Sequence, residues 1–428
     1  MGRKNATGNK TSTVDRYRQE LGRQEKKVTA EHRREIKRLK SEQETVSYWK
    51  MFSKNLITRL LNIEYPLIQA PMSPLTTPEL VASVSNAGGM GTIAGARMRS
   101  EELKDEIRHV RSLTNKLFGV NLFIPSIQYD ILPHEIDSVR KELKKLIVDK
   151  RLKNFSIDID SIPVKLTKDI FSEQIEIVLN EKVSVLSFTF GCLSDDIINK
   201  CKQLGIKLIG TATTTKEAVF LKHRGCDAIC LQGSEAGGHR GSFLTNDIET
   251  IEQSTIGLQS LLSQTTQFID PTVYPLIAAG GIMDGIGLAN AIRSGASGVQ
   301  MGTRFLTCEE SIKLVPEAHR KLLLEAKNDI NNLRPTVLTR AYTGKPARGI
   351  QTAITDHFRA SGNKEKVLLP WQIQSQLVLP LCKFAAETKQ IDFMQLWAGQ
   401  NYARCENQSA TAIVNQTIEQ ACKILTGN

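Results

Sequence analysis

The sequence predicts an α/β protein, a (β/α)8 TIM barrel with a helical insertion and a helical C-terminal addition. Eight short apolar runs alternate with longer amphipathic stretches between residues 65 and 308, and most of the runs end in small or polar residues. Apolar strands that alternate with helices are typical of a parallel sheet covered on both faces. Eight such units favour a closed barrel. A doubly wound open sheet is the alternative, but no GxGxxG sequence follows the first run.

The expected strands share a short, continuous apolar core. They are residues 66–70, 91–95, 118–123, 183–190, 207–212, 228–233, 275–280 and 298–303. Helix signals lie between them. In the first connection Thr77 is a suitable N-cap, Pro78 takes the first helical position, and Gly88 and Gly89 end the helix. The connection before the sixth strand follows the same plan and stops at Gly225.

Two parts of the chain exceed what a barrel needs. Residues 125–180 contain "HEIDSVRKELKKLIVDKR", an amphipathic helix that we expect in an insertion after the third strand. Residues 309–428 follow the eighth strand and are expected to form helices with one loop-like segment, 339–351. We expect this addition to pack on the barrel. The predicted division is therefore an N-terminal extension (1–50), a barrel (51–308) and a helical addition (309–428).

The N-terminal extension holds most of the positive charge. Residues 1–50 contain 14 Lys and Arg against 7 Asp and Glu, so they carry +7 of the formal net charge of +11. A basic tail can bind nucleic acid or an acidic membrane surface. The mixture of both charge signs and the scarcity of apolar residues favour a disordered extension or a solvated helix instead. We therefore expect no nucleic-acid partner to be required, and Met51 opens a more typical N-terminus.

The remaining composition favours a cytoplasmic enzyme. Apolar residues make up 40% of the chain, yet no stretch approaches the roughly 20 apolar residues that span a bilayer. The eight cysteines form no CxxC pair, which predicts reduced structural thiols. The sequence contains no HxxxH or HExxH motif, so no metal site is expected. The oligomeric state is open between monomer and homodimer.

The predicted strand ends indicate a flavin site. In such barrels the chemistry lies at the carboxyl ends of the strands, and phosphate commonly binds after the seventh and eighth. Here those ends read "AAGGIMDG" and "QMGTRF", whose glycines allow close approach of main-chain N–H groups to phosphate. Asn121 and Gln232 end the third and sixth strands and could hydrogen-bond to the edge of a flavin ring. The cofactor predicted is FMN; amides satisfied within the core are the alternative.

The sixth strand runs into "QGSEAGGHRGSF", residues 232–243. The glycine pair lets this loop fold closely over a flat ligand, and His239 follows directly. An imidazole can accept a proton near neutral pH, which suits a general base beside a flavin. A purely structural histidine is the alternative.

These stretches resemble the class I nitronate monooxygenases, formerly called 2-nitropropane dioxygenases. The resemblance rests on "IQAPMSPLTTPELVASVSNAGGMGTIAG", "FGVNLFIPS", "LSFTFG", "GTATTTKEA", "LQGSEAGGHRGSF", "LIAAGGIMDG", "GVQMGTRFLTCEE", "YTGKPARGI" and "LWAGQ", over roughly residues 60–404. It implies an FMN-bound barrel that oxidises alkyl nitronates, of the propionate 3-nitronate type, with dioxygen. The products would be an aldehyde or ketone and nitrite, without a nicotinamide cofactor.

The resemblance also assigns residues. It implies that His239 is catalytic, and it gives Arg304 no role because many members carry a smaller residue there. The implied flavin contacts are Met72, Asn121, Gln232, Gly237, Gly281, Gln300, Met301, Gly302 and Thr303.

Three other functions were weighed. A flavin-dependent enoyl-acyl-carrier-protein reductase shares the barrel, a similar histidine loop and the "AAGGI" turn, and it would use NAD(P)H. An enzyme like inosine-monophosphate dehydrogenase is disfavoured, because no cysteine lies in the loop after the sixth strand. A non-catalytic flavin-binding scaffold with a basic interaction tail is the third, and the intact set of strand-end residues argues against it.

Overall fold

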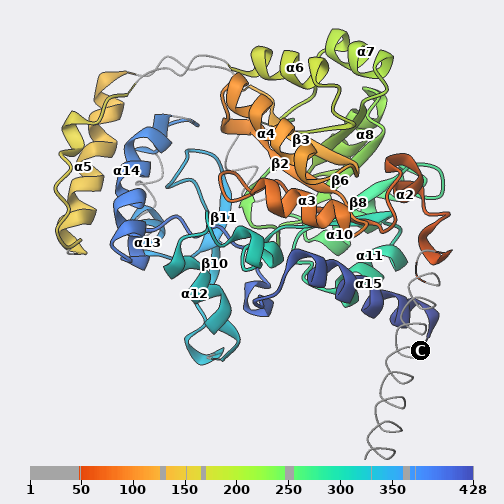
Figure 1. The fold of residues 1–428 in the computed structure, drawn as a ribbon. Coiled ribbons are helices and arrows are strands. Elements are labelled where there is room, and N and C mark those ends of the chain that lie inside the picture. Colours follow the sequence, from red (N-terminus) through yellow and green to blue (C-terminus); the bar gives the residue numbers. More distant parts are fainter. Residues whose placement is uncertain are drawn as a thin grey trace, which may run out of the picture. The chain divides into compact units, whose positions relative to one another are not determined.

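The eight apolar runs form eight parallel strands of one barrel, which confirms the predicted fold (Figure 1). The strands are β1 (Leu67–Gln69), β2 (Gly91–Ala94), β3 (Phe118–Phe123), β4 (Val185–Thr189), β5 (Lys207–Ala212), β6 (Ala228–Gln232), β8 (Leu276–Ala279) and β9 (Gly298–Met301). Their order is β1-β9-β8-β6-β5-β4-β3-β2. A parallel bridge between Ile68 and Met90 connects the two ends of this sheet, so the barrel is nearly closed.

This computed structural model describes residues 48, 50–125, 132–150, 152–164, 170–245, 255–328, 330–359, 367–371 and 373–427. Residues 52–428 form one unit, and 1–51 are grouped separately. The expectations for the basic extension fall almost entirely outside the described residues, so they stay predictions.

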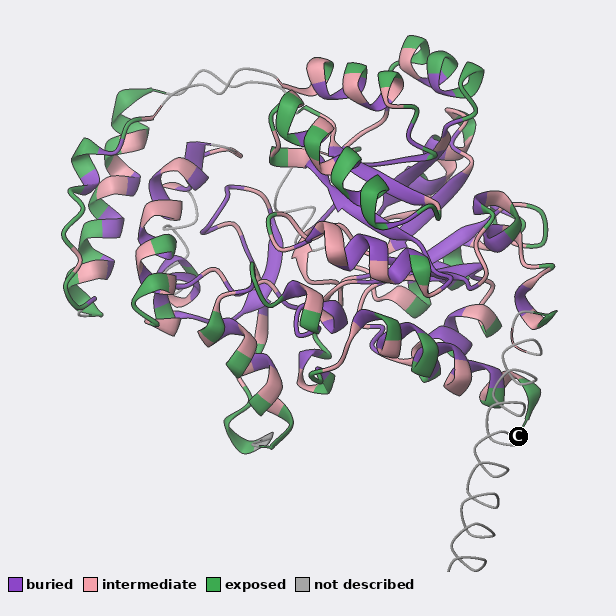
Figure 2. Cartoon of the chain, viewed as in Figure 1, coloured by how far each residue is buried: buried purple, intermediate pink, exposed green. Residues whose placement is uncertain are grey.

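Helices surround the barrel where the sequence signals place them. They are α3 (Pro78–Asn86), α4 (Ser100–Leu113), α6 (Phe171–Asn180), α7 (Asp195–Gln203), α8 (Thr215–His223), α10 (Leu258–Thr265) and α11 (Gly285–Arg293). The hydroxyl of Thr77 accepts a hydrogen bond from the N–H of Leu80 at 3.0 Å, so Thr77 is the N-cap of α3. Figure 2 shows the strands buried and these helices buried on one side only.

A short helix covers the amino-terminal end of the barrel. Ile57 and Leu61 of α2 (Leu56–Leu61) belong to the same buried cluster as Ile68 of β1 and Ile277 of β8. Ile57 also lies beside the first residue of β9, Gly298, where an added Cβ would come within 2.9 Å of its side chain. The amino ends of the strands are therefore closed, and a cavity can open only at their carboxyl ends.

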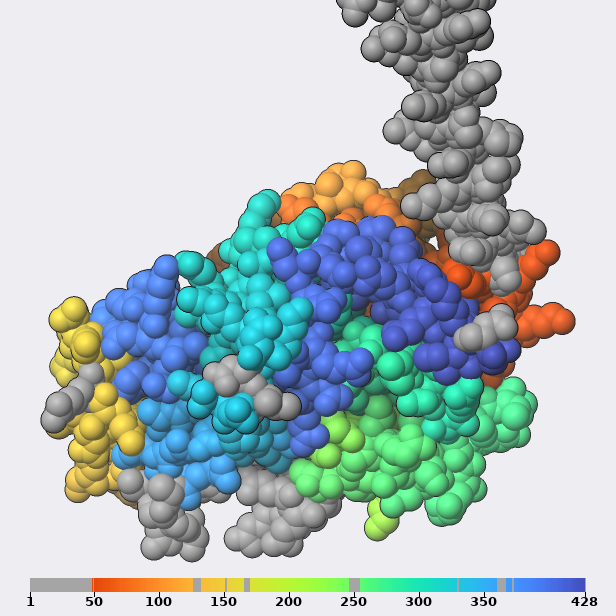
Figure 3. Space-filling model, turned by 90° about the horizontal axis from the view of Figure 1, so that it is seen from below, coloured from red at the N-terminus to blue at the C-terminus, as the bar shows by residue number. Residues whose placement is uncertain are grey.

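The last helix of the chain supplies the eighth helix of the barrel. α15 (Ala410–Thr426) packs against α11 and α3, the helices that follow β8 and β1. A Cβ at Gly285 would lie 2.4 Å from the carbonyl oxygen of Thr417, so only glycine permits this approach. Figure 3 shows the dark-blue C-terminal residues lying over this face. We expected the barrel to end at residue 308 and the addition to begin at residue 309. α15 lies in that addition, yet it packs as part of the barrel.

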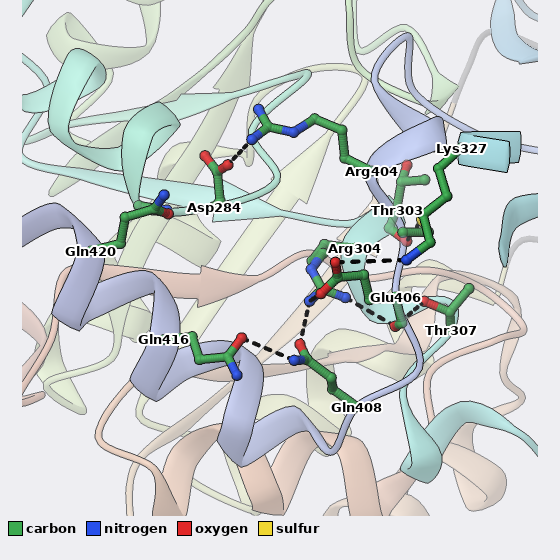
Figure 4. A network of polar contacts seen from close by, with 12 residues as sticks. Asp284, Thr303, Arg304, Thr307, Lys327, Arg404, Glu406, Gln408, Gln416 and Gln420 are labelled. Atoms are coloured by element: carbon green, nitrogen blue, oxygen red, sulfur yellow. Dashed lines mark hydrogen bonds and ion pairs between the residues drawn. The ribbon is translucent and has the colours of Figure 1, made fainter. Parts of the chain in front are cut away.

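Arg304, to which the sequence assigned no role, anchors the segment before α15. It is buried, and its guanidinium donates to the carbonyl oxygen of Glu406 at 3.0 Å and to the side chain of Gln408 (Figure 4). The hydroxyl of Thr307 donates to the same carbonyl at 2.8 Å. Arg304 therefore connects the end of the barrel sheet to the start of its eighth helix.

The insertion and the C-terminal addition share one apolar core. It combines Val139 and Leu143 of α5 (Pro133–Asp149) with Tyr342 and Phe358. In Figure 1 the yellow α5 lies next to the blue α13 and α14. The other elements of this lobe are β10 (Thr336–Thr339), β11 (Ala347–Ile350), α12 (Glu317–Glu325), α13 (Ala353–Arg359) and α14 (Ile373–Glu387).

The segment 339–351 was expected to be loop-like, but it contains β11. This strand pairs in antiparallel fashion with β10 on one side and with β7 (Gly238–His239) on the other. The partner β7 belongs to the histidine loop that follows β6. β11 reads Ala-Arg-Gly-Ile and so gives little strand signal, and its pairing with β7 joins segments that are far apart in the chain, which explains the difference.

Candidate functional site

A cavity opens at the carboxyl ends of the barrel strands. With its mouth it encloses an empty volume of ≈ 1390 Å³, and its walls come from the ends of seven strands, the histidine loop and the "LWAGQ" segment. Nine of the ten residues expected in the site line it: Met72, Asn121, Gln232, Gly237, His239, Gly281, Gln300, Gly302 and Thr303. Met301 does not, since its side chain is fully buried. Neighbouring side chains of a strand point to opposite faces, so Gln300 faces the cavity and Met301 the helices.

The glycines after β8 and β9 leave room for a phosphate. Gly280 and Gly281 have φ of +122° and +68°, which side-chain-bearing residues rarely adopt. An added Cβ at Gly302 would meet only Ala70 at 3.4 Å and Met72 at 3.8 Å, so its main chain faces open space. A phosphate group fits such an exposed glycine-rich main chain.

The deeper wall of the cavity carries polar side chains that can hydrogen-bond to the edge of a flat ring. Asn121 donates from Nδ2 to the hydroxyl of Ser187 at 3.0 Å, which leaves its carbonyl oxygen for a ligand. Thr189 and Thr211 lie next to each other with their hydroxyl oxygens 3.4 Å apart. These residues all line the cavity. The donors and acceptors present therefore fit a flavin ring over the barrel and its phosphate at the glycine turns.

Gln232 holds the histidine loop. Its Nε2 donates to the carbonyl oxygen of His239 at 2.9 Å, and its Oε1 accepts from the N–H of Gly241 at 2.9 Å. Both ends of the Gln232 amide therefore already bond to the loop, and a flavin would have to share this amide with them. The same side chain lines the cavity and fixes the main chain that carries the imidazole.

The glycine pair before His239 is explained by close packing. A Cβ at Gly237 would lie 2.5 Å from the carbonyl carbon of Ala398 and from the nitrogen of Gly399, both in "LWAGQ". Gly238 has φ +74°. The first glycine allows two main-chain segments to touch, and the second adopts a left-handed conformation. The histidine loop can thus lie directly against the C-terminal addition.

His239 is fixed on several sides. Its main chain pairs with Ala347 of β11, and its Nε2 lies 3.0 Å from the hydroxyl of Thr343. That hydroxyl donates to the carbonyl oxygen of Lys345 at 3.3 Å, so it accepts the Nε2 proton and leaves Nδ1 unprotonated. Four aromatic rings surround the imidazole at centroid distances of 4.7–6.1 Å: Trp371, Trp397, Phe190 and Phe123.

This environment keeps His239 neutral. Its pKa is held well below the usual value, because burial disfavours the charged imidazolium and because Arg97 and Lys345 are close. Neither cation was identified from sequence. Lys345 lies in the "YTGKPARGI" stretch but was given no role there, and Trp371 lies in none of the stretches quoted above. Both are far along the chain from the histidine loop, so only the tertiary fold brings them here.

Two buried charged residues behind the loop also went unnoticed. The carboxylate of Glu217 accepts hydrogen bonds from Thr213 and from the main-chain N–H of Phe243, all at 2.7 Å. Arg240 donates from Nη1 to the carbonyl oxygen of Gln232 at 2.8 Å. Glu217 was treated only as part of a helix start, since its partners lie in a loop that follows much later. Both residues hold the loop that carries His239.

Comparisons with known proteins agree with this geometry. The nitronate monooxygenase family model matches residues 54–420. A probable nitronate monooxygenase of Staphylococcus aureus (strain MSSA476) is 39% identical over 376 residues, which cover 88% of this chain and 99% of that protein. The solved nitroalkane oxidase from Streptomyces ansochromogenes is 30% identical with a TM-score of 0.74, over 87% of this chain and 99% of that one. FabK from Thermotoga maritima, 24% identical with a TM-score of 0.65 over 87% and 98%, shares the fold.

Proposed function

The chain belongs to the nitronate monooxygenase family, and from this premise we propose that it binds FMN and oxidises short alkyl nitronates, such as propionate 3-nitronate, with dioxygen. Members of the family are FMN-dependent oxidoreductases. The products are nitrite and an aldehyde or ketone. The observation that carries the proposal is His239 in an aromatic enclosure, on the wall of the same cavity as the glycine turns.

When bound, FMN would supply the chemistry of electron transfer from the nitronate to dioxygen. The residues of this chain position the reactants. The main chain at Gly281 and Gly302 would hold the phosphate, and Asn121 would hydrogen-bond to the ring. The rings of Trp371 and Trp397 beside His239 exclude water from the imidazole, which strengthens every electrostatic contact made there.

The state of His239 favours nitronates over neutral nitroalkanes. An imidazole whose pKa is depressed is unprotonated at neutral pH and available as a base, but it holds an abstracted proton weakly. A nitronate has already lost that proton. His239 can therefore act on a nitroalkane as a modest base, while on a nitronate it needs only to orient the substrate.

An anaerobic stopped-flow experiment tests this function. The purified protein should be yellow, and mixing with propionate 3-nitronate should bleach the flavin absorbance whereas NADPH should not. Bleaching by NADPH alone would favour the enoyl-acyl-carrier-protein reductase. No bleaching by either would favour a non-catalytic scaffold. With air admitted, nitrite should accumulate as dioxygen is consumed.

A cytoplasmic location is part of the proposal. All eight cysteines are free thiols, which is typical of a reducing compartment. None of the helices in the described residues is long and apolar enough to cross a membrane. Removal of a reactive nitro compound there would serve detoxification.

A further inference from the structure

Arg97 lies at the cavity beside the catalytic histidine. It ends the 3-10 helix Gly95–Arg97 that follows β2, and it lines the cavity. The central carbon of its guanidinium is 5.3 Å from the ring centroid of Trp371. The same ring lies 4.7 Å from that of His239. One indole therefore separates the guanidinium from the imidazole.

No acidic side chain neutralises Arg97 in the part of the chain that the structure describes. Its guanidinium contacts the indole of Trp371, and its charge acts on His239. Arg99, two residues later, differs: it pairs with Glu102 at 2.6 Å. The described residues that line the cavity include no aspartate or glutamate. A guanidinium with a stacked face and free N–H edges presents five donors to whatever enters the cavity.

A second cation strengthens the positive potential at this place. The Nζ of Lys345 lies 4.1 Å from the ring centroid of Phe190, whose ring contacts both His239 and Trp371. The region around the imidazole therefore combines two cations and apolar rings. Such a place attracts an anion, because two positive charges lie there and no carboxylate of the described cavity lining opposes them; the exposed Arg97 side chain is also accessible to a ligand.

On the basis of the proposed function, we propose that Arg97 binds a carboxylate of the substrate and so selects nitronates that carry a second negative charge. The nitronate group then lies next to His239, and the carboxylate lies on the Trp371 side. Guanidinium and carboxylate form paired, charge-assisted hydrogen bonds with defined geometry, so Arg97 also sets the orientation of the substrate. A nitronate with an alkyl tail fills the same space without these bonds.

The test compares two substrates of similar shape in the FMN-loaded protein. Propionate 3-nitronate carries the carboxylate, and propyl-1-nitronate carries a methyl group in its place. Arg97→Gln should lower kcat/KM for propionate 3-nitronate by roughly 10- to 100-fold, mostly through KM, which is the scale of a hydrogen bond to a charged group. The value for propyl-1-nitronate should change by no more than about twofold. Arg97→Lys keeps the positive charge but loses the planar pair of N–H donors that matches a carboxylate. Its kcat/KM for propionate 3-nitronate should therefore lie between those of wild type and Arg97→Gln.

Arg99→Gln is the matched control, because Arg99 is paired with Glu102 and lies outside the cavity lining. It should leave both substrates unaffected. Equal losses on both nitronates in Arg97→Gln would overturn the inference, and so would loss of FMN, which would assign Arg97 to the cofactor. A wild-type protein that oxidises neither nitronate would instead contradict the proposed function.

A second measurement needs no variant and covers the case in which Arg97→Gln does not fold. Butanoate should inhibit wild-type oxidation of propyl-1-nitronate competitively, because its carboxylate can occupy Arg97. Butan-1-ol at the same concentration should not inhibit. Equal effects of the acid and the alcohol would contradict a carboxylate site.

Discussion

The imidazole of His239 and the hydroxyl of Thr343 lie 3.0 Å apart, although 104 residues separate them in the chain. One residue belongs to the loop after β6 of the barrel, and the other precedes β11 in the C-terminal addition. The pairing of His239 with Ala347 joins the same two segments through their main chains. The addition therefore contributes to the candidate site and is more than a cover for the barrel.

Replacing His239 should separate two activities. If the imidazole acts as a base, His239→Asn should lower turnover of neutral nitroalkanes by roughly 10²- to 10⁴-fold, the usual scale for loss of a general base. Preformed nitronates need no proton removed, so their turnover should fall much less. Nitrite release from a nitroalkane and from its own nitronate measures both. Equal losses would mean that His239 only orients the substrate.

Thr343 should act as a positioning residue. Thr343→Val keeps the shape of the side chain but removes the oxygen that accepts the Nε2 proton of His239. We expect about a tenfold fall in kcat on nitroalkanes and a changed pH profile, because the imidazole loses its fixed tautomer. Thr426→Val is the control, since that hydroxyl donates within its own helix, α15, to the carbonyl oxygens of Cys422 and Lys423. An unchanged pH profile in Thr343→Val would show a purely structural role.

Lys345 should make substrate binding depend on pH. Burial lowers the pKa of its ammonium group to about 8. The side chain is thus a cation below that pH and becomes neutral as the pH rises through it, so the attraction for an anionic nitronate should weaken. KM for propionate 3-nitronate should therefore rise above about pH 8. Lys345→Arg, whose charge persists at higher pH, should remove this rise, and Lys345→Met should show the raised KM at every pH. A rise of the same size in both variants would assign it to another group.

The sequence identified those parts of the molecule that depend on local pattern. All eight barrel strands coincide with apolar runs, because strands buried on both faces must be continuously apolar. The strand ends then indicated Asn121, Gln232 and the two glycine turns, since the carboxyl ends of parallel strands meet on one side, and the family resemblance supplied the rest of the nine expected residues that line the cavity. Met301 was misplaced because the alternation along β9 turns it away.

The parts that could not be predicted depend on contacts between distant segments. The enclosure of His239 uses Trp371 and Trp397, which lie more than 130 residues beyond it. Trp397 belongs to the "LWAGQ" stretch, but nothing in that stretch indicates a contact with His239. β7 has two residues and forms only because β11 lies beside it. The buried Glu217 has a sequence position typical of a helix start, but its carboxylate binds the loop that carries His239. None of these pairings follows from periodicity.

Gly237 should be the most sensitive glycine of the site. In Gly237→Ala the new methyl group would lie 2.5 Å from two main-chain atoms of Ala398 and Gly399, and main chain cannot move aside as a flexible side chain can. The histidine loop must then shift away from the "LWAGQ" segment, and with it the main chain of His239. We expect a loss of stability of ~1–3 kcal/mol, the usual cost of overpacking, together with lower FMN content and turnover. Gly119→Ala is the matched control: neither Gly237 nor Gly119 has a left-handed φ, and an added Cβ at Gly119 would make only ordinary contacts, at 3.5 Å or more. Thermal midpoint and flavin absorbance of the two variants measure the difference. If Gly237→Ala and Gly119→Ala behaved alike, close contact between the two loops would not be what requires glycine at position 237.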